Sequence, residues 1–100
     1  MNTGYALPVD PVQSFLIVVW KELLGIEYIG VNDSFFTLGG HYLKATQLIS
    51  RIAEKYSIEM DLNELYDANT VSLLAETIKN KLARLLENMS AQGANEYLVT

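Results

Sequence analysis

The side chains that could take part in chemistry are few, and the informative ones lie in one segment, residues 30–43. His41 is the only histidine in the chain, and a histidine can act as a general base. No nucleophile–base pair surrounds it, so we expect no catalytic role for His41. The preceding Gly39-Gly40 pair fits either an ordinary turn or a backbone that another molecule approaches closely. Asp33, taken alone, is typical of a loop or capping carboxylate.

The composition excludes several other kinds of site. The chain has no cysteine, which excludes disulfide scaffolds, thiol nucleophiles and cysteine-rich zinc sites. One histidine cannot build a histidine metal cluster. The formal net charge of −5 disfavours a general nucleic-acid binder, because neutralising phosphates requires a basic surface.

The length and hydropathy pattern set further limits. One hundred residues make one domain, so a self-contained multi-step enzyme is not expected. The longest purely apolar stretch, Phe15–Trp20, is far shorter than the ~20 residues of a membrane span. The N-terminus lacks a charged region followed by an apolar one, so we expect no secretory signal and a cytoplasmic location.

Helical periodicity predicts the elements that must position residues 30–43. Asp10 and Pro11 are typical of a helix start, and Gly25 is typical of a helix end. Residues 25–41 form a long loop that is too apolar to be free, so we expect it to fold back onto the helices. The expected helices are Pro11–Leu24, Tyr42–Tyr56, a short one over about Asn63–Tyr66, and one behind the N-cap Thr70, from Val71 to Met89.

These elements predict an all-α fold, a four-helix bundle with three long helices, one short helix and a long loop between helices 1 and 2. Residues 1–8 and 90–100 show no hydrophobic period and are interpreted as an N-terminal linker and a C-terminal linker or tail, which leaves a domain over 9–89. The expected apolar face of the last helix consists of Val71, Leu74, Ala75, Ile78, Leu82, Leu85, Leu86 and Met89.

The run Asp33-Ser34-Phe35-Phe36-Thr37-Leu38-Gly39-Gly40-His41 resembles the signature of peptidyl carrier domains of non-ribosomal peptide synthetases. These domains generally read Asp-x-Phe-Phe-x-Leu-Gly-Gly-His-Ser-Leu at this place. The segments Trp20–Gly25 and Ile29–Val31 resemble the family's first helix and its exit, and the likeness runs from about Tyr5 to Leu86. The resemblance implies a bundle of the acyl-carrier type.

The resemblance also implies a function. In such carrier domains the serine after Gly-Gly-His receives 4′-phosphopantetheine from coenzyme A, through a separate phosphopantetheinyl transferase. The arm then holds aminoacyl or peptidyl thioesters and moves between adenylation, condensation and thioesterase domains, in the biosynthesis of antibiotics and other secondary metabolites. The carrier is not an enzyme, because it contributes only the tethering that raises effective concentration.

The chain departs from the family at the attachment position, which is Tyr42 instead of serine. Ser34 and Ser50 lie eight residues away on either side, and Thr46 is one turn into the helix, so none of them is in register to replace it. A tyrosine oxygen lies one ring further from the backbone than a serine oxygen, and group transfer tolerates little displacement. We therefore expect this chain to remain without the arm.

Other residues near position 42 are expected to contribute through contacts. The resemblance places Gly40, His41 and Asp33 around the cofactor attachment position. Leu43 points away from the core stripe of its helix, with Lys44 and Gln47 beside it as a polar rim, and this helix start is where family carriers meet their partners. The expected partner-binding residues are Leu43, Lys44, Gln47 and Leu38.

Two hypotheses remain open from the sequence. The first is a carrier domain with a blocked attachment position, and the second is an interaction module that kept the bundle and docks without loading. We expect a folded monomer in either case, because Tyr42 should face solvent at a helix start. Five acids and one lysine between Glu54 and Asp67 fit either a solvated face or a docking surface for a basic partner.

Overall fold

The first helix of the domain is fixed by signals at both ends. A computed structural model describes residues 7–99 of the chain, with side chains through residue 88. In it, α1 spans Pro11–Leu24, as the sequence predicted, and the Asp10 carboxylate accepts a hydrogen bond from the Gln13 backbone N–H at 2.8 Å. Gly25 ends the helix with φ +67° and donates its N–H to the Lys21 carbonyl at 2.9 Å.

The next two helices also follow local signals. Helix α2 spans Tyr42–Tyr56, as the sequence predicted. Helix α3 spans Leu62–Asp67, one residue longer at each end than predicted, and starts with a capping box in which Asp61 and Glu64 bond each other's backbone N–H groups. Ile58 and Met60 of the connection between α2 and α3 are buried, and this connection is not a strand.

The last helix, α4, spans Val71–Val99 and begins where the Thr70 hydroxyl accepts a hydrogen bond from the Leu73 N–H at 3.1 Å. The sequence predicted its end near Met89 and interpreted residues 90–100 as a linker or tail, and the end near Met89 was wrong. Residues 90–99 contain no proline, and one glycine costs a helix only about 1 kcal/mol. Loss of the hydrophobic period therefore does not by itself mark the end of this helix.

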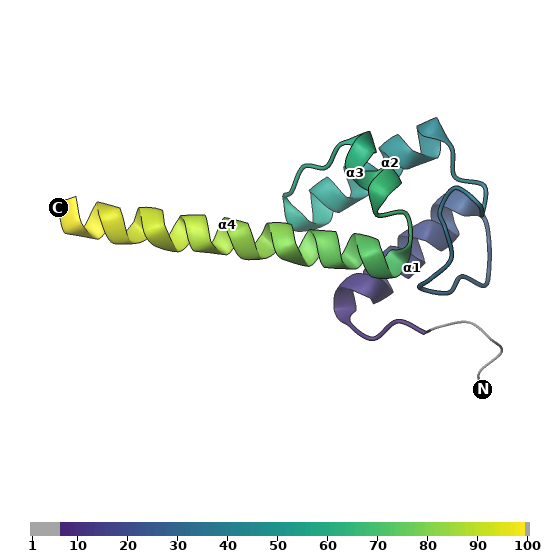
Figure 1. The fold of residues 1–100 in the computed structure, drawn as a ribbon, viewed down its shortest axis with the longest axis horizontal. Helices are drawn as coiled ribbons and strands as arrows, with labels where there is room; N and C mark the ends of the chain where they lie inside the picture. The colour runs from purple at the N-terminus through teal and green to yellow at the C-terminus, as the bar shows by residue number, and fades with distance from the viewer. Residues whose placement is uncertain (1–6, 100) are drawn as a thin grey trace.

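The four helices pack as one all-α bundle, with α1 against both α2 and α4 and with α3 against α2. In Figure 1 the later part of α4, drawn in yellow-green to yellow, projects well beyond the other three helices. The fold class is therefore confirmed. The domain limits at 9 and 89 stay a prediction, and residues 1–6 of the expected N-terminal linker lie outside the described part. The largest fully buried side chains are those of Trp20, Phe35, Leu16, Leu48, Ile52, Leu65, Leu74 and Ile78.

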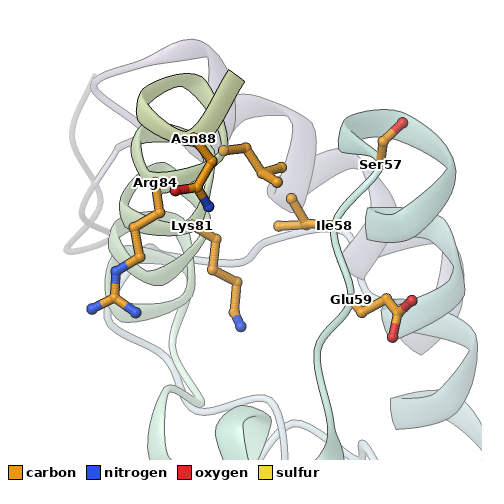
Figure 2. Close-up of a pocket in the computed structure, with 7 residues that line it drawn as sticks. Ser57, Ile58, Glu59, Lys81, Arg84 and Asn88 are labelled. Carbon is orange, nitrogen blue, oxygen red and sulfur yellow. The ribbon is translucent and has the colours of Figure 1, made fainter. Parts of the chain in front are cut away.

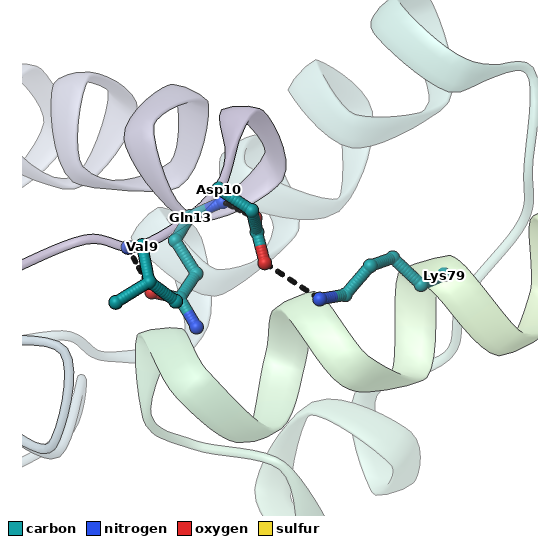
Figure 3. Close-up of polar contacts among 4 residues, drawn as sticks. All are labelled: Val9, Asp10, Gln13 and Lys79. Carbon is teal, nitrogen blue, oxygen red and sulfur yellow. Dashed lines mark hydrogen bonds and ion pairs between the residues drawn. The ribbon is translucent and has the colours of Figure 1, made fainter.

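The start of α1 is tied to α4 by an ion pair (Figure 3). Lys79 Nζ lies 2.6 Å from Asp10 Oδ2, so one carboxylate both caps α1 and bonds α4. This hydrogen bond, helped by the Gln13 N–H, lowers the pKa of Asp10 below its ordinary value. Gln13 in turn accepts a hydrogen bond from the Val9 N–H at 2.9 Å, which fixes the chain as it enters the helix.

The loop over residues 25–41 is held to the bundle, as its apolar content predicted. Ile29, Val31 and Phe35 are buried. The backbone adds two hydrogen bonds, one to the connection between α3 and α4, from the Phe35 N–H to the Asn69 carbonyl (2.7 Å), and one to the first turn of α4, from the Ser72 N–H to the Val31 carbonyl (2.9 Å). The loop is therefore an ordered part of the fold that delivers residues 33–41 to the start of α2.

Candidate functional site

The exposed start of α2 presents position 42. His41 is the N-cap residue, with extended backbone angles (φ −137°, ψ −176°), and its side chain makes no capping hydrogen bond. Tyr42 is the first helical residue and is 67% exposed, and Leu43 behind it is 59% exposed. The expectation that Tyr42 would face solvent is therefore confirmed.

The glycine pair before His41 has two different structural reasons. Gly39 adopts φ +108°, a conformation that only glycine adopts readily. Gly40 has no such constraint, but a Cβ atom on it would overlap the Phe35 ring and lie 2.7 Å from the Phe35 carbonyl oxygen. The Gly40 N–H also donates to that carbonyl at 2.9 Å. Internal packing alone thus requires glycine at position 40, whatever a partner requires there.

A row of aromatic rings anchors the loop over residues 25–41 to the helices. Phe35 packs edge-on against Trp20, with ring centroids 5.0 Å apart, and against Phe36 at 5.5 Å. Phe36 then stacks on Tyr66 of α3 at 4.5 Å, with the ring planes 15° apart. The two phenylalanines therefore anchor the loop to α1 and α3. Sequence reasoning assigned Tyr66 no part in the site, because a stack between a loop and a distant helix leaves no signal in spacing.

Asp33 uses its carboxylate inside the loop. Its Oδ2 accepts a hydrogen bond from the Gly30 N–H at 2.9 Å, and its own N–H donates to the Gly30 carbonyl at 3.1 Å. The side chain therefore closes a tight turn. This supports the loop interpretation of Asp33, and its expected place beside the attachment position stays a prediction.

The residues expected to contact partners are accessible to different degrees. Leu43 and Gln47 are exposed, whereas Leu38 and Lys44 are half-buried. Thr46 donates its hydroxyl hydrogen to the Leu43 carbonyl at 2.7 Å, so this hydroxyl is engaged in its own helix. These positions border the exposed start of α2 and leave its first turn open.

Part of the acidic segment after α2 serves the fold. Glu64 lies 2.7 Å from Lys81 Nζ, and this hydrogen bond lowers the pKa of the Glu64 carboxyl. Asp61 and Glu64 also form the cap of α3. These two acids are therefore committed to intramolecular contacts, and the choice between a solvated face and a docking surface concerns only the other three acids of the segment, which are exposed.

The start of α2 fits the phosphate of a phosphopantetheine arm in its surroundings but not in its attachment atom. The first-turn N–H groups of a helix lack intrahelical acceptors and favour an anion, and here the N-cap side chain does not occupy them. The residue at the attachment position is, however, Tyr42, whose hydroxyl lies at the far end of an aromatic ring. Within the described residues there is also no cluster of three potential metal ligands and no helix able to cross a bilayer.

Comparisons with known sequences agree with this geometry. A family model described as the phosphopantetheine attachment site matches residues 14–78. Gramicidin S synthase 2 of Brevibacillus brevis is 44% identical over 81 residues, which cover 81% of this chain. The matched segment is 2% of that synthase, so the chain spans a small part of the curated relative it matches.

Solved structures agree as well. A peptidyl carrier protein in complex with the phosphopantetheine transferase Sfp and coenzyme A matches with a TM-score of 0.74 and 34% identity, over 76% of this chain and 99% of that one. A chain of a non-covalent extended docking domain complex of the Pax NRPS, PaxA T1-CDD with PaxB NDD, matches with a TM-score of 0.80 and 31% identity, over 97% of this chain and 93% of that one. The chain belongs to the phosphopantetheine attachment site family, as a non-catalytic peptidyl carrier domain of the kind found in non-ribosomal peptide synthetases.

Proposed function

We propose that this domain occupies the carrier position of a non-ribosomal peptide synthetase and that, with tyrosine at position 42, it carries no 4′-phosphopantetheine. The observation that supports the proposal is the combination at the start of α2. The helix start and the loop that leads to it have the carrier arrangement, and the exposed residue at the attachment position is a tyrosine. When bound, the arm supplies the thiol that holds acyl groups as thioesters.

The reason for the unloaded state is geometric. Tyr42 occupies the first helical position, where a serine oxygen would lie close to the backbone and to the first-turn N–H groups. The phenol oxygen lies at the far side of a ring, well outside that position. A transferase that aligns a serine hydroxyl with coenzyme A cannot align this oxygen by the same contacts, and small misplacements cost large factors in rate.

The proposed partners are those of a working carrier. They are a phosphopantetheinyl transferase and adenylation, condensation and thioesterase domains, contacted through Leu43, Gln47, Lys44 and Leu38. The Pax carrier structure, which corresponds to nearly all of this chain, is a docking domain complex. We therefore add a docking segment on a second polypeptide of the assembly line. We also propose that the domain is a monomer in the cytoplasm.

The alternative of an interaction module that docks without loading has less support. The family model and the relatives identify carrier domains. The described loop and the start of α2 also keep the packing of the signature, from Phe35 to Gly40. No feature of the described residues besides Tyr42 argues against loading, so the carrier hypothesis is retained with one blocked position.

The test is the intact mass of the protein after incubation with coenzyme A, magnesium and a promiscuous phosphopantetheinyl transferase. We expect the mass of the chain as sequenced to stay unchanged and the Tyr42→Ser variant to gain one phosphopantetheine. Tyr42→Ala is the matched control, because it removes the ring without supplying a hydroxyl. A gain of mass by the tyrosine form would contradict the reach argument. No gain by the serine variant would show that the recognition surface is lost beyond one residue.

A further inference from the structure

Tyr66, near the end of α3, contacts the loop that leads to position 42 without being part of the core. Its side chain is 52% exposed, whereas the side chain of the neighbouring Leu65 is fully buried. The Tyr66 ring stacks on the Phe36 ring, with the centroids 4.5 Å apart. Leu65 therefore holds α3 to the interior of the bundle, and the Tyr66 ring adds a contact between α3 and the loop.

Backbone hydrogen bonds continue this contact from the two phenylalanines to the start of α2. The Phe36 carbonyl accepts a hydrogen bond from the Gly39 N–H at 3.3 Å. The Phe35 carbonyl accepts one from the Gly40 N–H at 2.9 Å. Gly40 directly precedes His41, the N-cap residue of α2. A change in the orientation of Phe36 therefore moves the backbone from which α2 begins.

Asn69 links the same residues from the other side. Its side-chain Nδ2 donates to the Tyr66 carbonyl at 3.2 Å, and its own carbonyl accepts the Phe35 N–H at 2.7 Å. Phe35 and Phe36 are adjacent in the chain and pack ring against ring. A closed set of contacts thus joins Tyr66, Phe36, Phe35 and Asn69. Tyr66 takes part in it through both its ring and its backbone, so the loop end is fixed relative to α3.

The opposite end of α3 contacts α4 instead. The Glu64 carboxylate, in the first turn of α3, lies 2.7 Å from Lys81 Nζ of α4. Just before α3 a groove of about 350 Å³ opens, and the described residues that line it come from α4 and from the connection after α2 (Figure 2). The link between α3 and the loop over residues 25–41 therefore lies at the C-terminal end of α3, where Tyr66 is.

We propose that Tyr66 is a positioning residue for the attachment position of this domain. By holding Phe36 it fixes the loop end before α2, and with it the direction in which position 42 presents its side chain to a transferase. The inference rests on the carrier function proposed above and adds to it a residue outside the start of α2. Because group transfer tolerates little displacement of the nucleophile, a loose loop end lowers the rate of loading more than the affinity for the transferase.

The first test needs no loading and uses the full chain as sequenced. Hydrogen exchange of the Gly40 N–H, measured by NMR, reports on the loop end because this group bonds the Phe35 carbonyl. Tyr66→Ala removes the stacked ring and should speed this exchange about two- to tenfold relative to the core amides. Tyr66→Phe keeps the ring and should leave the exchange unchanged.

Leu73→Ala is the matched control for the exchange measurement. Leu73 is 47% exposed, close to the exposure of Tyr66, and it is not one of the stacked rings. Its removal should leave exchange at Gly40 unchanged. The proposal is overturned if Tyr66→Ala leaves this exchange unchanged too, or if Leu73→Ala speeds it equally. Tyr66→Leu replaces Tyr66→Ala if circular dichroism shows that the alanine variant does not fold.

The second test measures the kinetics of loading in the Tyr42→Ser background, with coenzyme A and a promiscuous phosphopantetheinyl transferase. Tyr66→Ala should lower kcat about two- to tenfold and change KM less than about twofold. Tyr66→Phe should be loaded like its parent. A rise in KM at constant kcat would mean that Tyr66 contacts the transferase directly, and the positioning role would then be wrong.

A double variant tests whether Tyr66 acts through Phe36. Phe36→Leu alone should also lower kcat, and adding Tyr66→Ala to it should lower kcat little further, because the stack is already lost. Fully additive effects on the logarithm of kcat would show that Tyr66 acts by another route, which overturns the proposal.

The two tests keep the positioning role distinct from the carrier proposal. If the Tyr42→Ser variant is not loaded at all, only the carrier proposal fails, and exchange at Gly40 decides the role of Tyr66. If the serine variant is loaded and Tyr66→Ala leaves its kcat unchanged, only the positioning role fails.

Discussion

In the segment over residues 33–43, some residues face the interior of the bundle (the inward half) and others face solvent (the outward half). The two groups obey different constraints. Phe35 is fully buried and Gly40 is packed against its ring, so both are set by the interior of the bundle. Tyr42 and Leu43 are mostly exposed and have little of the fold resting on them. The comparison teaches that one short motif contains residues fixed by packing and residues on which the packing of the fold does not depend. A change in the second group can remove a function and leave the fold intact.

The largest effect on stability should come from removing a buried ring from the inward half of the segment. Phe35 is fully buried and touches the rings of Trp20 and Phe36. Phe35→Ala should lower the free energy of unfolding by about 3–5 kcal/mol, measured by urea denaturation followed by circular dichroism. Phe36→Ala is the comparison variant, and its loss should be smaller because this ring is half-buried. Equal losses for the two variants would contradict the expectation that the fully buried Phe35 ring contributes more to stability than the half-buried Phe36 ring.

The next largest effect on stability should come from adding a side chain at Gly40, where there is no room for one. Gly40→Ala places a methyl group against the Phe35 ring and carbonyl, which should cost about 1–3 kcal/mol of the free energy of unfolding. Gly39→Ala meets no atom within 4 Å and is strained only by φ +108°, so its cost should be about 1–2 kcal/mol.

A double variant separates these two causes of destabilisation. Combining Gly40→Ala with Phe35→Leu should cost less than the sum of the single changes, because the smaller side chain relieves the overlap with the ring and leaves only the close approach to the carbonyl oxygen of residue 35. Gly39→Ala with Phe35→Leu should be additive. Additivity in both pairs, again from urea denaturation, would mean that the Phe35 ring is not what excludes a side chain at position 40.

The same division explains how far the sequence alone could lead. Asp10, Pro11 and Gly25 are local signals, so the limits of α1 followed from the sequence, and the limits of α2 followed from its periodicity. The signature indicated the site because it lies in one continuous run. The overlap of Gly40 with Phe35 and the stack of Phe36 on Tyr66 depend on tertiary geometry and could not be read from spacing. The continuation of α4 past Met89 was missed because the hydrophobic period on which the prediction depended stops there.

A smaller effect should come from polar contacts outside the segment. In the folded protein the pKa of Asp10 is lowered by its bond to Lys79, and that of Glu64 by its bond to Lys81. Such carboxyls stabilise the fold above their unfolded pKa, near 4, and this contribution is lost as the pH falls through the lower folded value. Because both pairs are partly exposed, each should contribute less than about 1 kcal/mol.

The measurement is the free energy of unfolding between about pH 6 and pH 2.5, for the parent chain and for Lys79→Met. The variant should show a shallower loss of stability on acidification, because the pKa of its Asp10 moves back toward the ordinary value. A steeper loss in the variant would contradict the assigned role of Lys79. If removing this one pair lowered the free energy of unfolding by several kcal/mol, the prediction would be wrong, because a partly exposed ion pair would then stabilise the fold about as much as the buried ring of Phe35.

The smallest effect on stability should come from the exposed part of the segment, at the position that we propose decides loading. Tyr42 is 67% exposed at the first position of α2, so Tyr42→Ser should change the free energy of unfolding by less than about 0.5 kcal/mol. Amide spectra should shift only near the start of α2. If the variant instead loses more than 1 kcal/mol, the tyrosine ring supports the loop, and its presence would then have a structural reason. A negligible change means that the fold places no demand on position 42, so that the residue there can change the proposed loading of the domain without changing its stability.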